Sequence, residues 1–180
     1  ISGSPPARSS GSSGPTPTPG ATALRLAREG AWVHLCGVDE ALNEEARRAC
    51  AGLSVAVSRV DLTRDEEVGA WVEGAAAGGG IDSLVNAAGI QTYGDLETTT
   101  PGDWDRVMAV NLRSFFMTSH LAWPHLKVQG KGAIVHVSSV QGFANQSNVL
   151  GYATTKGAVH AMTRAMAVDC APHGVRVVSV

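Results

Sequence analysis

Tyr152 and Lys156 are separated by four positions, and Ser139 lies thirteen positions before the tyrosine. Four residues correspond to about one helical turn, so the tyrosine and the lysine would share one face of a helix. A free phenol, with a pKa of about 10, is a poor proton donor or acceptor at neutral pH, but a neighbouring ammonium favours the phenolate by charge attraction. Ser139 could hydrogen-bond a substrate carbonyl oxygen and hold it against the phenol. These three residues therefore predict acid/base chemistry at a carbonyl or hydroxyl group.

The elements that would position these residues alternate along the chain. Apolar runs typical of strands occur at residues 32–36, 53–60, 81–86, 133–137 and 175–180. Helical patterns separate these runs, at residues 21–30, 40–51, 64–77, 101–126 and 151–171. The alternation predicts an α/β protein with a doubly wound parallel sheet and helices on both of its faces. Ligands of such sheets bind outside the carboxyl ends of the strands, which is where Ser139 would lie.

Glycine, proline and serine mark the boundaries of this pattern. Residues 1–20 are almost entirely Ser, Gly, Pro and Thr, which predicts a disordered or irregular segment, an expression tag being the alternative. The remaining residues, 21–180, are predicted to form one domain. Gly30 is expected to end the first helix, and Pro124 is expected to kink or stop the long helix that contains it.

Composition excludes several classes of function. The net charge is −2 without a basic cluster, which argues against a nucleic-acid partner. Three cysteines without paired spacing suit a reducing compartment, and the six scattered histidines predict no metal site. No apolar run approaches the roughly 20 residues of a membrane span, and the N-terminus does not look like a signal peptide. We therefore expect a cytoplasmic protein that interacts with no membrane.

Four segments, in order, resemble motifs of the short-chain dehydrogenase/reductase family. Asn86-Ala-Ala-Gly89 resembles the Asn-Asn-Ala-Gly sheet motif, with Ala87 in place of the second asparagine. Asn111 matches the asparagine of the family's catalytic tetrad, and the stretch at 132–142 resembles the strand that leads to the serine. The stretch at 168–177 resembles the segment that leads into the family's sixth strand. The resemblance implies a Rossmann-like fold and hydride transfer between NAD(P)H and a ketone or secondary alcohol.

The resemblance also implies a role for each catalytic residue. Tyr152 would be the general acid/base, and Lys156 would promote its ionisation and bind the ribose of the nicotinamide. Ser139 would orient the small-molecule substrate, and Asn111 would hold a proton-relay water through its helix. The residues that would contact the coenzyme, besides the tyrosine and the lysine, are Asp61, Leu62, Asn86, Ala87 and Gly89. For Asn86, local hydrogen bonding within the sheet is the structural alternative.

Neither the coenzyme nor the substrate is specified closely by the sequence. After the strand at 32–36, Gly37 stands where an acidic residue would bind the ribose of NAD, and Asp39 comes late. Asp39 and the absence of a basic residue in this stretch favour NAD over NADP only slightly. Gln141, Phe143 and Val149 lie between the serine and the tyrosine, and they are candidates for the substrate pocket, with loop packing as an equal alternative.

The family pattern is broken at both ends of the chain. The opening strand and its Thr-Gly-x-x-x-Gly-x-Gly turn have no match within residues 1–20, where prolines stand among the glycines. The strand that would be missing is the central one, between those at 32–36 and 81–86, and its loss would leave unpaired edges. The substrate-covering lid is also absent after residue 180. We therefore expect a fragment, a truncated isoform, a faulty gene model or a degenerate relative.

Two hypotheses for function follow. The first is an NAD(P)-dependent oxidoreductase of the short-chain type. The second is a catalytically impaired relative that acts only by association. In the family, two long helices pair across a subunit interface, so the resemblance implies that residues 101–126 and 151–171 would mediate homo-oligomerisation.

Overall fold

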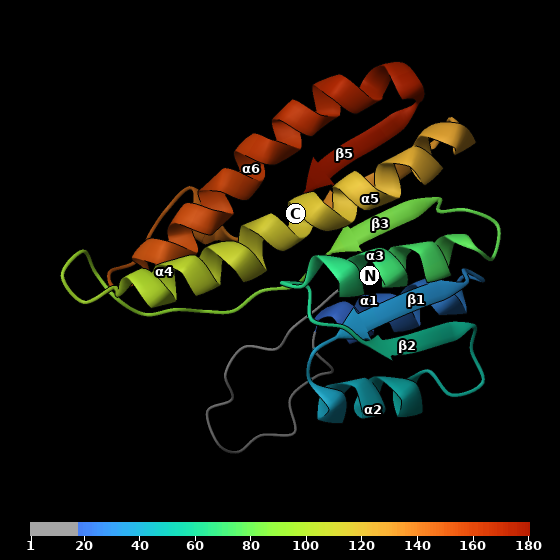
Figure 1. Ribbon diagram of the computed structural model, residues 1–180, viewed down its shortest axis with the longest axis horizontal. Helices are drawn as coiled ribbons and strands as arrows, with labels where there is room; N and C mark the ends of the chain where they lie inside the picture. Colours follow the sequence, from blue (N-terminus) through green and yellow to red (C-terminus); the bar gives the residue numbers. More distant parts are fainter. Residues whose placement is uncertain (1–17) are drawn as a thin grey trace.

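The computed structural model describes residues 18–180, which fold into an α/β arrangement (Figure 1). Its strands are β1 (Val33–Gly37), β2 (Val55–Arg59), β3 (Ser83–Asn86), β4 (Gly132–His136) and β5 (Val175–Ser179). Its longer helices are α1 (Thr18–Arg28), α2 (Glu40–Ala49), α3 (Asp65–Ala76), α4 (Pro101–Met108), α5 (Ser114–Gln129) and α6 (Leu150–Cys170). The remaining turns of helix are η1 (Ala109–Arg113), η2 (Val140–Gly142) and η3 (Ala171–His173). The predicted α/β class and the order of its elements are confirmed.

The strands form two parallel groups. Strand β1 pairs with β2, and β4 lies between β3 and β5, each pair being parallel. Within residues 18–180, no strand pairs with both groups, so the expected interruption lies between β1 and β3. Val85 of β3 nevertheless packs against the apolar cluster around β1, so the two groups lie side by side. The carboxyl ends of β3 and β4 meet at one edge, because Asn86 and His136 are register partners.

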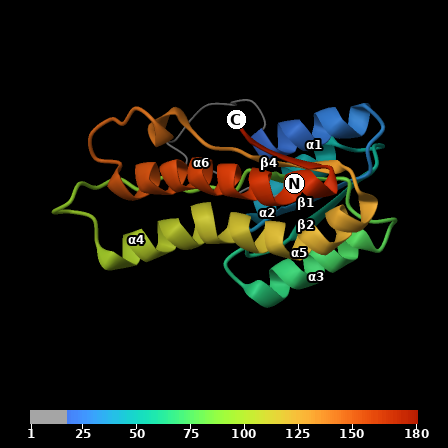
Figure 2. The same cartoon turned by 90° about the horizontal axis from the view of Figure 1, so that it is seen from above.

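Helices cover both faces of the strands (Figure 2). Small residues of α1 and α2 pack with Val33 and Leu35 of β1 in one apolar cluster. On the other face, α3, α5 and α6 contribute Val68, Phe115 and Val159 to a larger core. This arrangement explains why the strands carry near-continuous apolar runs, since a parallel strand is buried on both sides.

Two of the predicted helix boundaries were wrong. Helix α1 begins at Thr18, so the last three residues of the segment predicted to be irregular are helical, while residues 1–17 lie outside the described part of the chain. Of the two outcomes expected at Pro124, a kink or a stop, the stop does not occur, because the helix continues to Gln129. His120, whose carbonyl loses its helical donor to this proline, is exposed, so that water can satisfy it. The prediction for Gly30 is confirmed, because it follows α1 with φ +92° and donates to Ala27 O at 3.0 Å.

Gly174, which joins η3 to β5, offers a test of the fold. Its φ is +71°, and a Cβ there would collide with the backbone carbonyl of Gly130. Gly52 has φ +80° but open space around it, so it serves as the control. We expect Gly52→Ala to lower the free energy of unfolding by about 1 kcal/mol, the cost of a left-handed alanine. Gly174→Ala should lower it by about 3 kcal/mol, because a backbone clash is added. Urea unfolding of both variants measures the difference, and equal losses would contradict the predicted clash.

Candidate active site

Tyr152 and Lys156 lie on one face of α6, as their spacing predicts. The Nζ atom of Lys156 is 5.6 Å from the ring centroid of Tyr152 and 5.7 Å from that of Phe115. The lysine is only 4% exposed, and its Nζ donates to Val137 O at 2.8 Å, just beyond the end of β4. Burial lowers the pKa of Lys156 to about 8. A buried ammonium is thus held beside the aromatic ring of a half-buried tyrosine.

Asn111 connects this pair to the loop that follows β3. It lies in η1, a single π-helical turn between α4 and α5. Its Oδ1 accepts from Ile90 N at 2.8 Å, while its Nδ2 donates to Ile90 O at 2.9 Å and to Thr155 Oγ1 at 3.3 Å. Thr155 immediately precedes Lys156 in α6. The fully buried asparagine therefore fixes the loop, the long helix and α6 relative to one another.

Ser139 lies beyond the carboxyl end of β4, where the sequence places it. Its backbone is extended, and its Oγ accepts from Gln141 N at 3.2 Å, which caps the short helix η2. The hydroxyl is half-buried. Because Oγ acts as an acceptor in that bond, its own proton is available to a ligand.

Asn86 ends β3, and Ala87 and Gly89 continue from it toward the lysine. The side chain of Asn86 is fully buried and bonds within the protein, to one residue of the sheet and to residues of helix α5, so the alternative of hydrogen bonding within the sheet is present only in part. Its partners are Thr118 Oγ1 at 2.7 Å, Ser119 Oγ at 3.2 Å and His136 Nδ1 at 3.2 Å. A Cβ on Gly89 would lie 3.8 Å from Lys156 Nζ and 3.7 Å from Asn111 Oδ1. The backbone at Gly89 therefore lies directly beside the ammonium.

Asp61 and Leu62 lie elsewhere, after β2 in the other strand group. Hydrogen bonds from the hydroxyl and the backbone amide of Thr63 lower the pKa of the Asp61 carboxyl. The side chain of Leu62 is buried in the larger core. Like Ser139, the two predicted coenzyme contacts follow the carboxyl end of a strand. They belong to the β1–β2 group, however, whereas Ser139 follows a strand of the β3–β4–β5 group.

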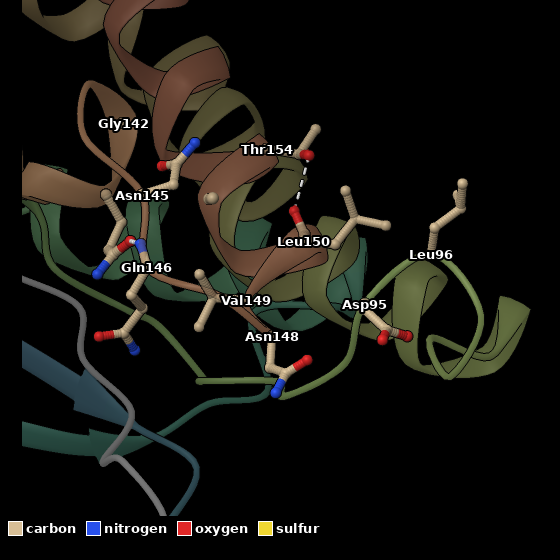
Figure 3. A pocket seen from close by; sticks show the side chains of 11 residues that line it. Asp95, Leu96, Gly142, Asn145, Gln146, Asn148, Val149, Leu150 and Thr154 are labelled. Carbon is tan, nitrogen blue, oxygen red and sulfur yellow. Dashed lines mark hydrogen bonds between the residues drawn. The ribbon is translucent and has the colours of Figure 1, made fainter.

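A cavity of about 390 Å³ opens beside the segment between the serine and the tyrosine (Figure 3). Among the predicted substrate residues, Gln141 and Val149 line it. Phe143 does not line it: its ring is 75% exposed and lies 4.1 Å, centroid to centroid, from the ring of His160. The rest of the wall includes the amide side chains of Asn145, Gln146 and Asn148. Ser139 and Tyr152 are close in sequence to residues that line this cavity, but neither of them lines it.

Several residues that build the site were missed by sequence reasoning. Their contacts join segments far apart in the chain, so no local spacing indicates them; they are Thr118, Ser119, His136, Val137, Thr155 and His160. Residues 18–180 hold no cluster of three or more His, Cys, Asp or Glu side chains arranged to bind a metal ion. No helix in this described range is long and apolar enough to cross a bilayer.

His136 predicts a loss of stability in acid. Its Nδ1 faces the amide donor of Asn86, its ring stacks on Phe115 with centroids 5.5 Å apart, and burial lowers its pKa to about 4. In the unfolded chain this histidine has a pKa of about 6.5. Below that pH the unfolded chain binds a proton that the folded chain does not bind, so the free energy of unfolding falls as the pH falls. Between pH 7 and pH 5 this loss should be about 2 kcal/mol. His136→Asn keeps an acceptor for Asn86 but cannot titrate. In urea unfolding, the free energy of unfolding of this variant should therefore fall by about 2 kcal/mol less than that of wild type between pH 7 and pH 5. An equal acid loss in both proteins would contradict the assignment.

Known proteins share both the sequence pattern and the fold. The short chain dehydrogenase family profile matches residues 20–180. Cyclopentanol dehydrogenase of Comamonas testosteroni is 37% identical over 160 residues, covering 86% of this chain and 63% of the relative. Gluconate 5-dehydrogenase of Gluconobacter oxydans is 34% identical over 158 residues, covering 84% and 60%. The chain therefore spans about three fifths of the length of these relatives.

Solved structures agree with this assignment. A short-chain dehydrogenase/reductase from Burkholderia xenovorans superposes with a TM-score of 0.88 at 29% identity, covering 99% of this chain and 72% of the other. A 3-ketoacyl-(acyl-carrier-protein) reductase from Brucella melitensis, solved with NADH, gives 0.82 at 31% identity, covering 87% and 67%. The match of the family profile to nearly all described residues, on a fold of the same kind, shows that this chain belongs to the short-chain dehydrogenase/reductase family.

Proposed function

We propose that the protein is a nicotinamide-dependent oxidoreductase that interconverts a ketone and a secondary alcohol. The observation that carries this proposal is the buried Lys156 ammonium beside the ring of Tyr152, at the edge where Ser139 follows β4. A cation held in a poorly solvated site stabilises a nearby phenolate more strongly than an exposed cation would. The arrangement suits proton transfer at a carbonyl oxygen better than any other chemistry among the described side chains.

In the proposed mechanism, Ser139 Oγ donates a hydrogen bond to the substrate oxygen and orients it toward Tyr152. The phenol gives its proton to that oxygen during reduction and takes the proton back during oxidation. Lys156 stabilises the phenolate that remains. The side chain of Asn111 is engaged by Ile90 and Thr155, so its contribution to a water-mediated proton relay would come from the backbone of its π turn. A nicotinamide coenzyme, when bound, supplies or accepts the hydride at the carbonyl carbon.

The residues near Lys156 fit the nicotinamide end of such a coenzyme. Gly89 leaves the backbone without a side chain beside the ammonium, which permits close approach of a ribose hydroxyl. We propose that Tyr152 and Lys156 bind this ribose and that Asn86, Ala87 and Gly89 form the adjoining wall. Asp61 and Leu62 would contact the adenine end, where the buried side chain of Leu62 leaves its backbone for the contact. Most of the glycines and prolines that stand in place of the usual phosphate turn belong to residues 1–17, outside the described part of the chain, whereas Pro19 and Gly20 lie in the first turn of α1.

We propose NAD as the preferred coenzyme. Asp39 follows β1 and caps α2 through one carboxylate oxygen, which accepts from Leu42 N at 3.1 Å and leaves the second oxygen for a ribose hydroxyl. Arg59, the register partner of Gly37, is a basic residue at this edge, but it interacts electrostatically with the carboxylates of Glu40 and Asp61. Because these carboxylates neutralise the charge of the arginine, this edge is expected to attract the additional phosphate of NADP only weakly.

We further propose that two copies associate through α4–α5 and α6. Phe116 on α5 is 48% exposed and Val168 on α6 is 75% exposed, which leaves apolar side chains on the outer faces of both helices. Size-exclusion chromatography with light scattering measures this association directly.

The three cysteines are free and buried, which supports the expected cytoplasmic location.

The proposal is tested by titrating the purified chain with NADH and NADPH while following fluorescence and circular dichroism. Saturable binding to a folded chain, tighter for NADH, followed by turnover of cyclic ketones or polyhydroxy ketones, is the expected result. A folded chain that binds neither coenzyme would reject the proposal and favour the alternative of a catalytically impaired relative that acts only by association.

A further inference from the structure

His160 lies one turn after Lys156 on α6 and has no part in the function proposed above. Its Nε2 is 3.0 Å from Ser138 Oγ, and its Nδ1 is 3.0 Å from Ser179 Oγ. Ser138 follows β4 and is buried, whereas Ser179 ends β5. One imidazole therefore bridges the carboxyl ends of two neighbouring strands and the helix that carries the catalytic pair.

The hydrogen-bond partners define the direction of each bond. Ser138 Oγ also lies 3.1 Å from Lys156 O, which can only accept, so the serine gives its single proton to that carbonyl. The serine oxygen must then accept from His160 Nε2–H. With its proton on Nε2, the neutral ring accepts at Nδ1 from the hydroxyl of Ser179. This tautomer satisfies all three bonds at once.

The same ring also supports the segment that follows Ser139. A Cβ on Gly142 would lie 2.6 Å from His160 Cδ2, so the backbone of η2 rests against the imidazole. The ring of Phe143 covers it from solvent at a centroid distance of 4.1 Å. Amides of Gly142 and Phe143 close η2 by donating to Ser139 O at 3.0 Å and Val140 O at 2.9 Å.

We propose that His160 is a positioning residue that holds Ser139 in place through its bond to Ser138 and its contact with η2. Ser139 is covalently next to Ser138, and its hydroxyl must meet the substrate oxygen within hydrogen-bond range of Tyr152. Loss of the Ser138 bond would loosen the segment between β4 and η2, whose remaining hydrogen bonds to α6 are those of Ser138 Oγ to Lys156 O and of Lys156 Nζ to Val137 O. The catalytic part of this inference rests on the proposed function, whereas its structural part does not.

Two substitutions of His160 by an amide residue distinguish the effect of its bond to Ser138 from that of its bond to Ser179. His160→Gln places an amide donor near the Nε2 position and can retain the bond to Ser138. His160→Asn places its amide oxygen near the Nδ1 position and retains only the bond from Ser179. We expect hydrogen exchange at the Gly142 and Phe143 amides to accelerate at least tenfold in His160→Asn and less than threefold in His160→Gln. Ser138→Ala removes the same bond from the other side together with the bond to Lys156 O, so it should accelerate exchange at least as much as His160→Asn. Ser179→Ala should resemble wild type.

Enzyme kinetics then test the catalytic part. We expect kcat to fall at least tenfold in His160→Asn with the coenzyme Kd unchanged, and to stay within threefold of wild type in His160→Gln. Equal exchange in all variants would overturn the positioning role, and so would an unchanged kcat in an active His160→Asn protein. If the exchange contrast is present but the wild-type chain shows no turnover, the positioning role is supported and the proposed function fails instead.

Discussion

Tyr152→Phe is expected to reduce turnover of a carbonyl substrate by about 10²- to 10⁴-fold, the usual contribution of a positioned general acid/base. The substitution removes one hydroxyl oxygen and keeps the aromatic ring that packs 5.6 Å from Lys156 Nζ. We therefore expect the circular dichroism spectrum and the free energy of unfolding to remain within about 0.5 kcal/mol of wild type. The measurement is kcat under saturating coenzyme.

The sequence provides a matched control for this variant. Its only other tyrosine, Tyr93, lies in the loop after β3 and is 76% exposed. Tyr93→Phe makes the same chemical change outside the proposed site, so its kcat should equal that of wild type. Comparable losses in both variants, or full activity in Tyr152→Phe, would reject Tyr152 as the acid/base.

The parts of this site that the sequence predicts are those that depend on local spacing. Tyr152 and Lys156 share a face because helical geometry alone places residues four apart on one side. Ser139 lies beyond a strand end because the apolar run before it stops there. For the same reason, the order of helices and strands and the end of α1 before Gly30 were predicted correctly.

The rest of the site depends on contacts between distant segments, which spacing does not indicate. Asn111 was identified from a resemblance, but its π turn and its bonds to Ile90 and Thr155 join residues 21 and 44 positions apart. His136 sits in an unremarkable apolar run, and only the fold places it against Asn86 and Phe115. Pro124 was expected to kink or stop its helix, and the helix does not stop there. Helix propensity alone does not take into account that the exposed carbonyl of His120 can bond water instead of a backbone amide.

Lys156→Met is expected to change activity and stability in opposite directions. Turnover should fall at least about a hundredfold, because no cation would remain beside the phenol to stabilise its ionised form. The free energy of unfolding at pH 7 should instead rise by roughly 1–3 kcal/mol. Burial lowers the pKa of this lysine from 10.5 to about 8, which means that the folded protein holds the ammonium at a cost of about 3 kcal/mol. Methionine removes that cost but leaves Val137 O without its donor, so the net gain is smaller.

The dependence on pH distinguishes this explanation from better packing of the methionine. Between pH 8 and pH 10.5, the unfolded chain keeps the lysine proton that the folded chain has lost, so wild-type stability rises with pH through this range. The advantage of Lys156→Met should therefore be complete below pH 8 and disappear toward pH 10.5. Lys131→Met, at an exposed position, should leave stability nearly unchanged at every pH. An advantage that persisted to high pH would show that packing, and not a buried charge, is responsible. A stabilising Lys156→Met variant without activity would identify the buried ammonium as a group that the fold keeps at the expense of its own stability.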